Sequence, residues 1–214
     1  MPLQIDKTLD GHIAACEQFS NALWTCTDGI TFTKTKVQTD IVLAYFTLAL
    51  EHFSAVIVLE KAGLSASAHA LLRPIHEAYI RGRWLHLCAT DEELSKAVAN
   101  EKFPVISKMV TQIEQFTRLN ETIEKTEEPL NRFTTYHESA WKIMNSYTHG
   151  GQKQILNRIT QTDVQSNFKD EQIIAGLNTA VGLALLTSTA ISRLLSQDDI
   201  AVSIYKKYQE IFKK

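Results

Sequence analysis

Residues that interrupt helices are scarce in this chain. Only eight glycines and four prolines occur among 214 residues, and the long stretches between them repeat apolar residues with the period of a helix. Glycine and proline are the residues that most often end helices and shape turns. No internal repeat, low-complexity tract or shift in composition marks a domain boundary. We therefore predict an all-α fold, with residues 1–214 forming one helical bundle in a single domain.

The bundle is expected to be built on four long central helices. These are predicted at about Lys36–Ala62, Ser65–Ala89, Pro129–Thr148 and Asp170–Leu195. Shorter helices are predicted at about Asp6–Thr25, Asp91–Lys102, Pro104–Asn120, Lys153–Ile159 and Asp198–Lys214. We expect Gly63 to end the first long helix and Ser65 to provide the N-cap of the second.

Two apolar runs are long enough to be considered as membrane spans. Ile41–Leu59 carries Glu51 and His52 in its middle, and Thr179–Leu195 carries Arg193 and several hydroxyl side chains. Charged groups at the centre of a bilayer are costly and rare. We therefore predict that both runs are central helices of a soluble bundle, with no membrane association.

Composition limits the partners and the compartment. The formal net charge is -2 and the sequence pI is about 6.4, so a large nucleic-acid-binding surface is not expected, although a local basic patch is allowed. Three widely spaced cysteines form neither a CxxC pair nor a zinc pattern, and the N-terminus lacks the apolar core of a secretion signal. These features predict a cytoplasmic protein.

The sequence lacks the common metal and cofactor motifs. Adjacent His and Glu residues occur at 51–52, 76–77 and 137–138, but neighbours on a helix point about 100° apart and cannot bind one ion together. The Glu-x-x-His spacing of di-iron bundles is absent, as are Walker A, GxGxxG and GxSxG motifs. We predict no metal and no cofactor, although three separate helices could each still offer one ligand.

The stretch from Tyr136 to Gly151 is the strongest candidate for a functional site. A helix places residues three, four, seven and eleven apart on one face. The residues that share such a face here are Glu138, Lys142, Asn145 and His149. Ala140, Ile143, Met144 and Tyr147 are expected on the packing side. Gly150 and Gly151 should end the helix and leave His149 at the mouth of a loop, where it can reach a ligand. The alternative is a solvated helix face that ends in a capping histidine.

The helix predicted at Ser65–Ala89 is the second informative stretch. Arg73 and Glu77 are one turn apart and can form an ion pair. Two interpretations remain open: a surface stripe of ion pairs, or a face on which Arg73 or Arg83 points at an anionic ligand near His149. Apolar residues lie among these charges, so we expect this face to pack against another element.

The segment Lys142-x6-His149, with Asn145 inside it, resembles the signature of the HEPN (higher eukaryotes and prokaryotes nucleotide-binding) superfamily. That signature is an arginine, four to six residues and a histidine, near the end of a late helix in an all-α bundle. The sequence Arg73-Pro74 followed by Glu77 is also similar to that of uncharacterised bacterial helical proteins with a His-Gly-Gly motif. The resemblance covers these two short stretches and the helical character of the rest.

The resemblance implies metal-independent cleavage of RNA. His149 would act as the general base, Asn145 would orient the imidazole or the phosphate, and Lys142 would stabilise the developing negative charge. The chain departs from the signature at Lys142, where the family has arginine. Arg73 or Arg158 could therefore fill the phosphate-binding role from elsewhere. Family members also imply a homodimer, an RNA or nucleotide ligand, and a role as a toxin with a cognate antitoxin or as an antiphage effector.

Two other classes of function remain open. In a non-catalytic helical protein, Asn145 and His149 would cap the helix, and the apolar faces would serve dimer or partner contacts. In a metal-dependent hydrolase, a chelator would abolish the activity.

Overall fold

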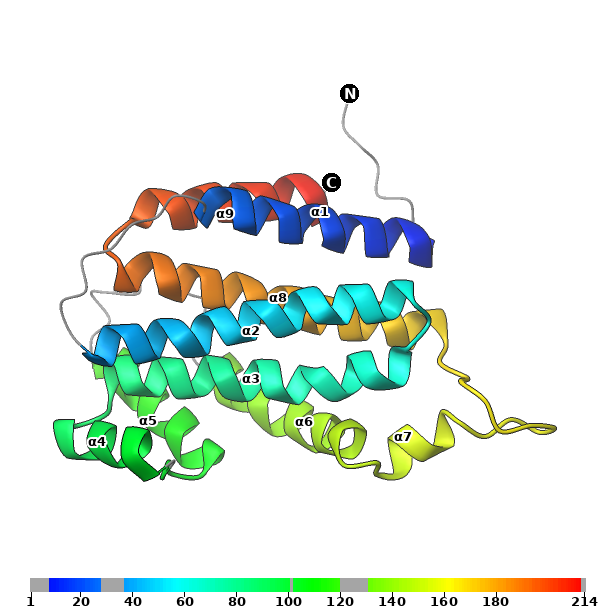
Figure 1. Cartoon of the computed structure of the whole chain (residues 1–214), viewed down its shortest axis with the longest axis horizontal. Helices are drawn as coiled ribbons and strands as arrows, with labels where there is room; N and C mark the ends of the chain where they lie inside the picture. Colours follow the sequence, from blue (N-terminus) through cyan, green and yellow to red (C-terminus); the bar gives the residue numbers. More distant parts are fainter. Residues whose placement is uncertain (1–7, 28–36, 101, 120–130, 213–214) are drawn as a thin grey trace.

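The structure is a computed structural model that describes residues 8–27, 37–100, 102–119 and 131–212 (Figure 1). All the regular elements in these ranges are helices, which confirms the all-α prediction. The described residues also contain one isolated antiparallel β-bridge, between Ile159 and Val164. The helices are α1 (Leu9–Thr27), α2 (Val37–Lys61), α3 (Ser65–Leu87), α4 (Asp91–Asn100), α5 (Ile106–Leu119), α6 (Asn131–Thr148), α7 (Gln152–Leu156), α8 (Asp170–Leu194) and α9 (Asp198–Phe212).

The predicted helix ends agree with the structure to within a few residues. Gly63 and Gly150 both have a positive φ, of 71° and 63°, and follow the ends of α2 and α6 as predicted. Five predicted helix ends lie outside the described residues: Asp6, Lys36, Asn120, Pro129 and Lys214. The prediction of Ser65 as an N-cap is wrong, because Leu64 occupies that position. The Ser65 hydroxyl donates a 2.6 Å hydrogen bond to the buried carboxylate of Glu60.

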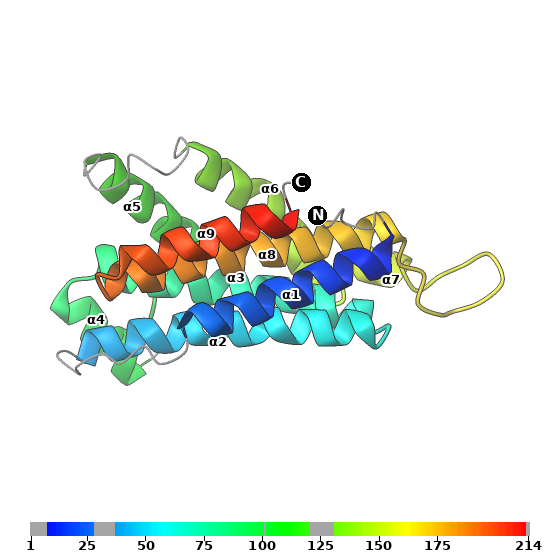
Figure 2. The ribbon, with the colours of Figure 1, turned by 90° about the horizontal axis from the view of Figure 1, so that it is seen from above.

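The helices are arranged in layers around α3. The helices α1 and α9 lie side by side over α2 and α8, and α3 lies on the other side of this central pair (Figures 1 and 2). The face of α3 away from α1 and α9 is covered by α5 and α6. At Gly82 of α3, a Cβ atom would come within 2.5 Å of the Phe46 ring of α2. Only glycine fits at this crossing without a shift of the Phe46 ring, so α2 and α3 can pack closely.

The charged face of α3 is buried against its neighbours, as the sequence predicted. His69, His76, Arg83 and Trp84 are all less than 5% exposed. One packing prediction for α6 is wrong: Ile143 is 42% exposed. Among the side chains of α6 that the structure describes, the buried ones are His137, Met144 and Tyr147, the last two as predicted. Their spacing of seven and three residues defines a stripe on which Ile143 does not lie.

The helices α2 and α8 are both long and apolar enough to cross a membrane. Length and composition alone are weak grounds for a membrane span, because the core helices of soluble bundles meet the same criteria. Here α2 and α8 pack against each other and against α1 and α3, and α2 contains the buried carboxylate of Glu60.

Candidate functional site

The C-terminal end of α6 is attached to α3 through a carbonyl group that Pro74 leaves without its helical partner. Proline has no N–H, so the carbonyl of Ala70, four residues earlier, accepts no hydrogen bond from position 74. The Thr148 hydroxyl donates to this carbonyl at 3.0 Å. Gly150 then ends the helix with a positive φ. The next residue after Thr148, His149, is thereby placed beside α3.

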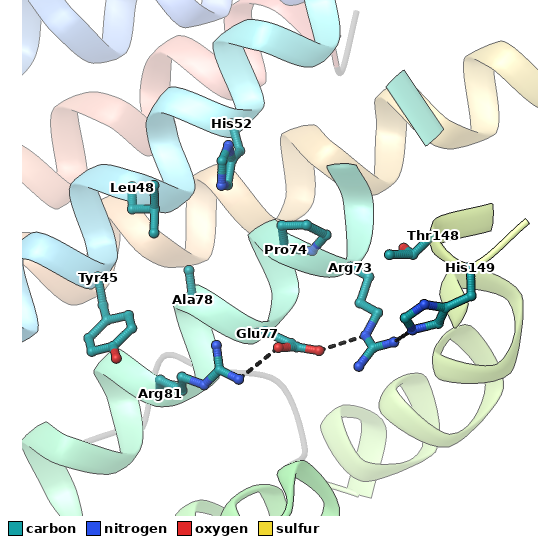
Figure 3. Close-up of a pocket in the computed structure, with 10 residues that line it drawn as sticks. All are labelled: Tyr45, Leu48, His52, Arg73, Pro74, Glu77, Ala78, Arg81, Thr148 and His149. Carbon is teal, nitrogen blue, oxygen red and sulfur yellow. Dashed lines mark hydrogen bonds and ion pairs between the residues drawn. The ribbon is translucent and has the colours of Figure 1, made fainter. Parts of the chain in front are cut away.

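His149 and Arg73 lie against each other, with the side chain of Glu77 next to Arg73 (Figure 3). The Nη1 group of Arg73 donates a hydrogen bond to Nε2 of His149. A guanidinium can only donate, so Nε2 must be the acceptor, and the neutral ring carries its proton on Nδ1. The Nε2 lone pair of an exposed histidine is thus directed at the arginine. The sequence interpretation in which Arg73 lies near His149 agrees with this geometry.

Glu77 joins two arginines on the same face of α3. Arg73 donates through Nε to one carboxylate oxygen at 2.6 Å, and Arg81 donates through Nη2 to the other at 2.8 Å (Figure 3). The predicted pairing of Arg73 with Glu77 is therefore present. Two guanidinium groups share one carboxylate, which leaves this row with one unit of positive charge.

Trp141 supports Arg73 from α6. The guanidinium carbon lies 4.8 Å from the centre of the indole ring, a cation–π distance. The Trp141 ring in turn packs against His137, with ring centres 5.1 Å apart. The guanidinium of Arg73 is therefore held by a carboxylate, an imidazole and an aromatic face.

A buried pair of histidines lies next to Trp141. His76 Nε2 and His137 Nδ1 are 2.9 Å apart, so one ring donates and the other accepts. Burial, and then the neighbouring His137, lowers the pKa of His76 to about 3. Burial also lowers the pKa of His137, against an opposing effect of Glu138. Both rings are neutral at physiological pH, and they add no charge beside Arg73.

Arg73 and His149 line an open hollow of about 310 Å³. This volume is near the lower end of the size range of small-molecule sites. The residues that line it are Tyr45, Leu48, His52, Arg73, Pro74, Glu77, Ala78, Arg81, Thr148 and His149. Along α3 the wall is a row of charges, and toward α2 it is formed by apolar and aromatic side chains (Figure 3). Such a surface can take an anionic group on the charged row and a flat apolar group beside it.

The structure does not bring the other α6 candidates into this hollow. Lys142 and Glu138 are exposed on α6 and do not line it. Asn145 is half-buried, and its side-chain oxygen is enclosed without a hydrogen-bond partner in the described part of the chain. Its backbone carbonyl accepts the N–H of His149 at 3.1 Å. Asn145 therefore supports the helix end that carries His149.

The remaining two arginine candidates lie elsewhere. Arg83 is buried on α3, and its charge contributes, after burial, to lowering the pKa of His86 to about 4. Arg158 is exposed in the segment between α7 and α8, which projects from one end of the bundle (Figures 1 and 2). Of the three arginines singled out in the sequence, Arg73 is the one in the hollow.

Arg81 and Trp141 shape the site but were not among the residues predicted from the sequence. Arg81 follows Glu77 by four residues, so helical spacing alone could have placed it on the same face. Trp141 carried no such signal, because its contact with Arg73 depends on how α6 crosses α3.

The fold and the site together define an all-α bundle with an open arginine–histidine site between two of its helices. Residues 46–214 match a family of unknown function, DUF6988, and the chain belongs to this family. The matched range includes all of α3 and α6 and the residue after α6, and thus Arg73, Glu77, Arg81 and His149. No curated protein and no solved structure matched the chain.

Proposed function

We propose that this protein is a HEPN-like ribonuclease that cleaves RNA without a metal ion, with His149 as the general base and Arg73 as the phosphate ligand. The observation that supports the proposal is the contact between Arg73 and the acceptor nitrogen Nε2 of His149 at the mouth of the hollow. Arginine grips a phosphate through parallel hydrogen bonds, which lysine cannot do. In this proposal Arg73 takes the role that the family signature gives to its arginine and that Lys142 occupies in sequence.

The reaction follows from this pairing. A phosphodiester bound by Arg73 would lie beside Nε2, within reach of the same lone pair. His149 takes the proton of the ribose 2′-hydroxyl, and the resulting oxygen forms a bond to the adjacent phosphorus. The bond from phosphorus to the 5′ oxygen breaks, and that oxygen takes a proton from water. The products are a 2′,3′-cyclic phosphate and a free 5′-hydroxyl, and Arg73 stabilises the negative charge that develops on the phosphoryl oxygens.

The test is cleavage of total RNA by the purified protein in EDTA. Removal of a general base lowers the rate by about 10²–10⁴-fold, so His149→Ala should lose cleavage. In Arg73→Lys the cleavage rate should fall by about 10²–10³-fold, because the point charge of an ammonium group replaces the forked guanidinium group. Lys142→Ala and Arg158→Ala are the matched controls, since both side chains lie outside the hollow, and both variants should cleave normally. Equal cleavage by the wild type and His149→Ala would contradict the proposal.

The same proposal places the protein in the cytoplasm as a homodimeric toxin or antiphage effector, with RNA as substrate and an antitoxin as a possible partner. Expression of the wild type should then arrest the growth of a bacterial host, and expression of His149→Ala should not. Light scattering of the purified chain should give the mass of a dimer. A monomer that cleaves RNA would remove the dimer from the proposal and leave the chemistry.

A second candidate is a non-catalytic helical interaction protein. The observation that favours it is the pairing of Glu77 with both Arg73 and Arg81, which neutralises part of their charge. In this candidate the three residues have a structural role alone, and Arg73 links α3 to α6. The two candidates differ in their response to Glu77→Gln. If the site binds phosphate, freeing both arginines from a competing carboxylate should strengthen the binding of inorganic phosphate in calorimetry, by about tenfold for one removed negative charge. If the cluster is only structural, no phosphate binding is expected from either protein.

A further inference from the structure

His69 is a buried histidine at the point where several segments meet. Its side chain is enclosed, with 3% of the residue exposed. Its neighbours come from α2, the start of α3, the end of α6, the segment before α8 and α8 itself. These neighbours are Glu60, Ser65, Tyr147, Phe168, Gln172 and Gly176. The proposed ribonuclease mechanism makes no use of His69.

Both ring nitrogens of His69 face groups that can only accept a hydrogen bond. Nδ1 lies 2.9 Å from the backbone carbonyl of Ser65, and Nε2 lies 3.1 Å from the backbone carbonyl of Gln172. A neutral imidazole has one N–H and one bare nitrogen, so it would set a lone pair against a carbonyl oxygen. Only the doubly protonated ring donates to both carbonyls.

The counter-charge for this ring is in place. Oε1 of Glu60 lies 3.4 Å from Nδ1 of His69, and the other carboxylate oxygen accepts a 2.6 Å hydrogen bond from the Ser65 hydroxyl. The side chains of His69 and Glu60 are 4% and 2% exposed. A carboxylate at this depth needs a cation and hydrogen-bond donors, and His69 and Ser65 supply them.

Aromatic rings and a glycine complete the enclosure. The rings of Tyr147 and Phe168 each have their centre 4.8 Å from that of the His69 ring, a separation at which aromatic faces favour a cation. At Gly176 a Cβ atom would come within 2.8 Å of Nε2. Because glycine has no Cβ atom, Gly176 leaves room for the His69 ring to lie directly against α8.

We propose that His69 is held as a buried imidazolium and that this cation is a positioning group for His149. Three consecutive residues at the end of α6 each contact α3: Tyr147 packs on the His69 ring, Thr148 bonds the Ala70 carbonyl, and His149 bonds Arg73. Loss of the His69 proton removes one donor and unpairs Glu60, which weakens the first of these contacts. The charge state of His69 stands on its own geometry, and its effect on catalysis rests on the proposed function.

The groups that face His69 explain why the proton stays. Burial lowers its pKa, but the hydrogen bond with Glu60, the carbonyls of Ser65 and Gln172, and the charge of Glu60 together raise the pKa above the ordinary value. From α6 the ionisable neighbour is the phenol of Tyr147, whose pKa burial raises. Phe168 and Gly176 are uncharged. On α3 the next cation is Arg73, one turn away and directed at Glu77 and His149.

The first test counts the nitrogen-bound protons of the His69 ring. Nitrogen-15 NMR of the histidine side chains at neutral pH should show two N–H groups on His69 and one on His76, whose pKa of about 3 makes it the neutral reference in the same spectrum. The second N–H of His69 should disappear at a higher pH than that of an ordinary histidine, because the pKa of His69 is raised. A single N–H on His69 at neutral pH would overturn the proposal.

The second test separates positioning from simple stability. Glu60→Gln keeps the shape and removes the charge, so the His69 titration midpoint should fall by about one to three pH units, the usual effect of one opposite charge. The alkaline decline of the RNA cleavage rate should shift to lower pH by the same amount. Glu114→Gln, at another buried carboxylate, should shift neither. A rate that falls equally at every pH would assign His69 a structural role only.

If the wild type cleaves no RNA, the proposed function fails while the positioning role can still be judged. The carbon-bound protons of the His149 ring then serve as the reporter, because His149 lies two residues beyond Tyr147. Their chemical shift should change at the His69 midpoint in the wild type and at the lowered midpoint in Glu60→Gln. No such change would overturn the positioning role.

Discussion

His69 and His76 lie two turns apart on α3 and are both buried, yet they carry different charges. His69 meets two carbonyls and a carboxylate, all of which accept hydrogen bonds. His76 meets another imidazole, which can donate as well as accept. The pKa of the first is raised by these acceptors despite its burial, and that of the second is lowered to about 3 by burial and the neighbouring ring. Burial lowers the pKa of both histidines, and the partners decide whether that effect is overcome.

The difference matters for the site because Arg73 lies between the two histidines on the same helix. On one side, the His69 cluster attaches the end of α6 to α3, α2 and α8. On the other side, the neutral pair of His76 and His137 supports Trp141 without adding a positive charge next to the guanidinium. The His69 cluster holds the end of α6 in place, and the neutral pair of His76 and His137 supports Trp141 without adding charge.

The largest expected effect is at His69. The variant His69→Leu leaves the carboxylate of Glu60 buried without a cation, which typically costs about 3–5 kcal/mol. The double variant His69→Leu with Glu60→Leu removes the orphaned charge and should recover most of that loss. Urea unfolding of the three proteins measures both effects. A double variant that is less stable than His69→Leu would show that the Glu60 carboxylate does not need the His69 cation in its buried position.

A smaller effect is expected at His76. The variant His76→Leu leaves one ring nitrogen of His137 without its partner, a loss of about 1–3 kcal/mol for a buried polar group. No charge is orphaned, so the destabilisation should be smaller than for His69→Leu. Unfolding of both variants in the same buffer makes the comparison. A larger loss at His76 would contradict the assignment of a neutral pair.

The two regions should also respond to pH in opposite directions. The pKa of His69 is raised, so its contribution to stability is complete below the unfolded value of about 6.5 and is lost as pH rises through the folded pKa. The pKa of His76 is lowered to about 3, so its contribution is present above about 6.5 and is lost as pH falls toward the folded pKa. Urea midpoints across pH 4–10 should decline at both ends. Glu60→Gln should flatten only the alkaline decline, and His76→Leu should reduce the acidic one.

The smallest effect on stability is expected at Arg73 itself. The variant Arg73→Gln removes a partly exposed ion pair with Glu77, a contact worth about 0.3–1 kcal/mol. The same change should abolish phosphate binding and RNA cleavage. Thermal unfolding and calorimetry on one sample compare the two losses. A loss of stability above about 2 kcal/mol with unchanged ligand binding would make Arg73 a structural link.

The sequence by itself determined the helices and part of the site. Few glycines and prolines and a regular apolar period were sufficient for the all-α class and for the ends of α2, α3 and α8, because these signals are local. Spacing along one helix also identified the pair of Arg73 and Glu77 and the position of His149 at a helix end. The placement of Arg81 was accessible in the same way, because i,i+4 neighbours share a face whatever surrounds the helix.

Only the tertiary structure decided which of these residues meet. Helical spacing gathered Lys142 and Glu138 with His149, but the way α6 lies against α3 turns those two side chains to solvent and sets Arg73 against the imidazole. The charge of His69 was also beyond the sequence, because it depends on carbonyl groups of Ser65 and Gln172, which are 107 positions apart in the chain. Backbone carbonyls are present at every residue, so a sequence carries no mark of where two of them will enclose a ring.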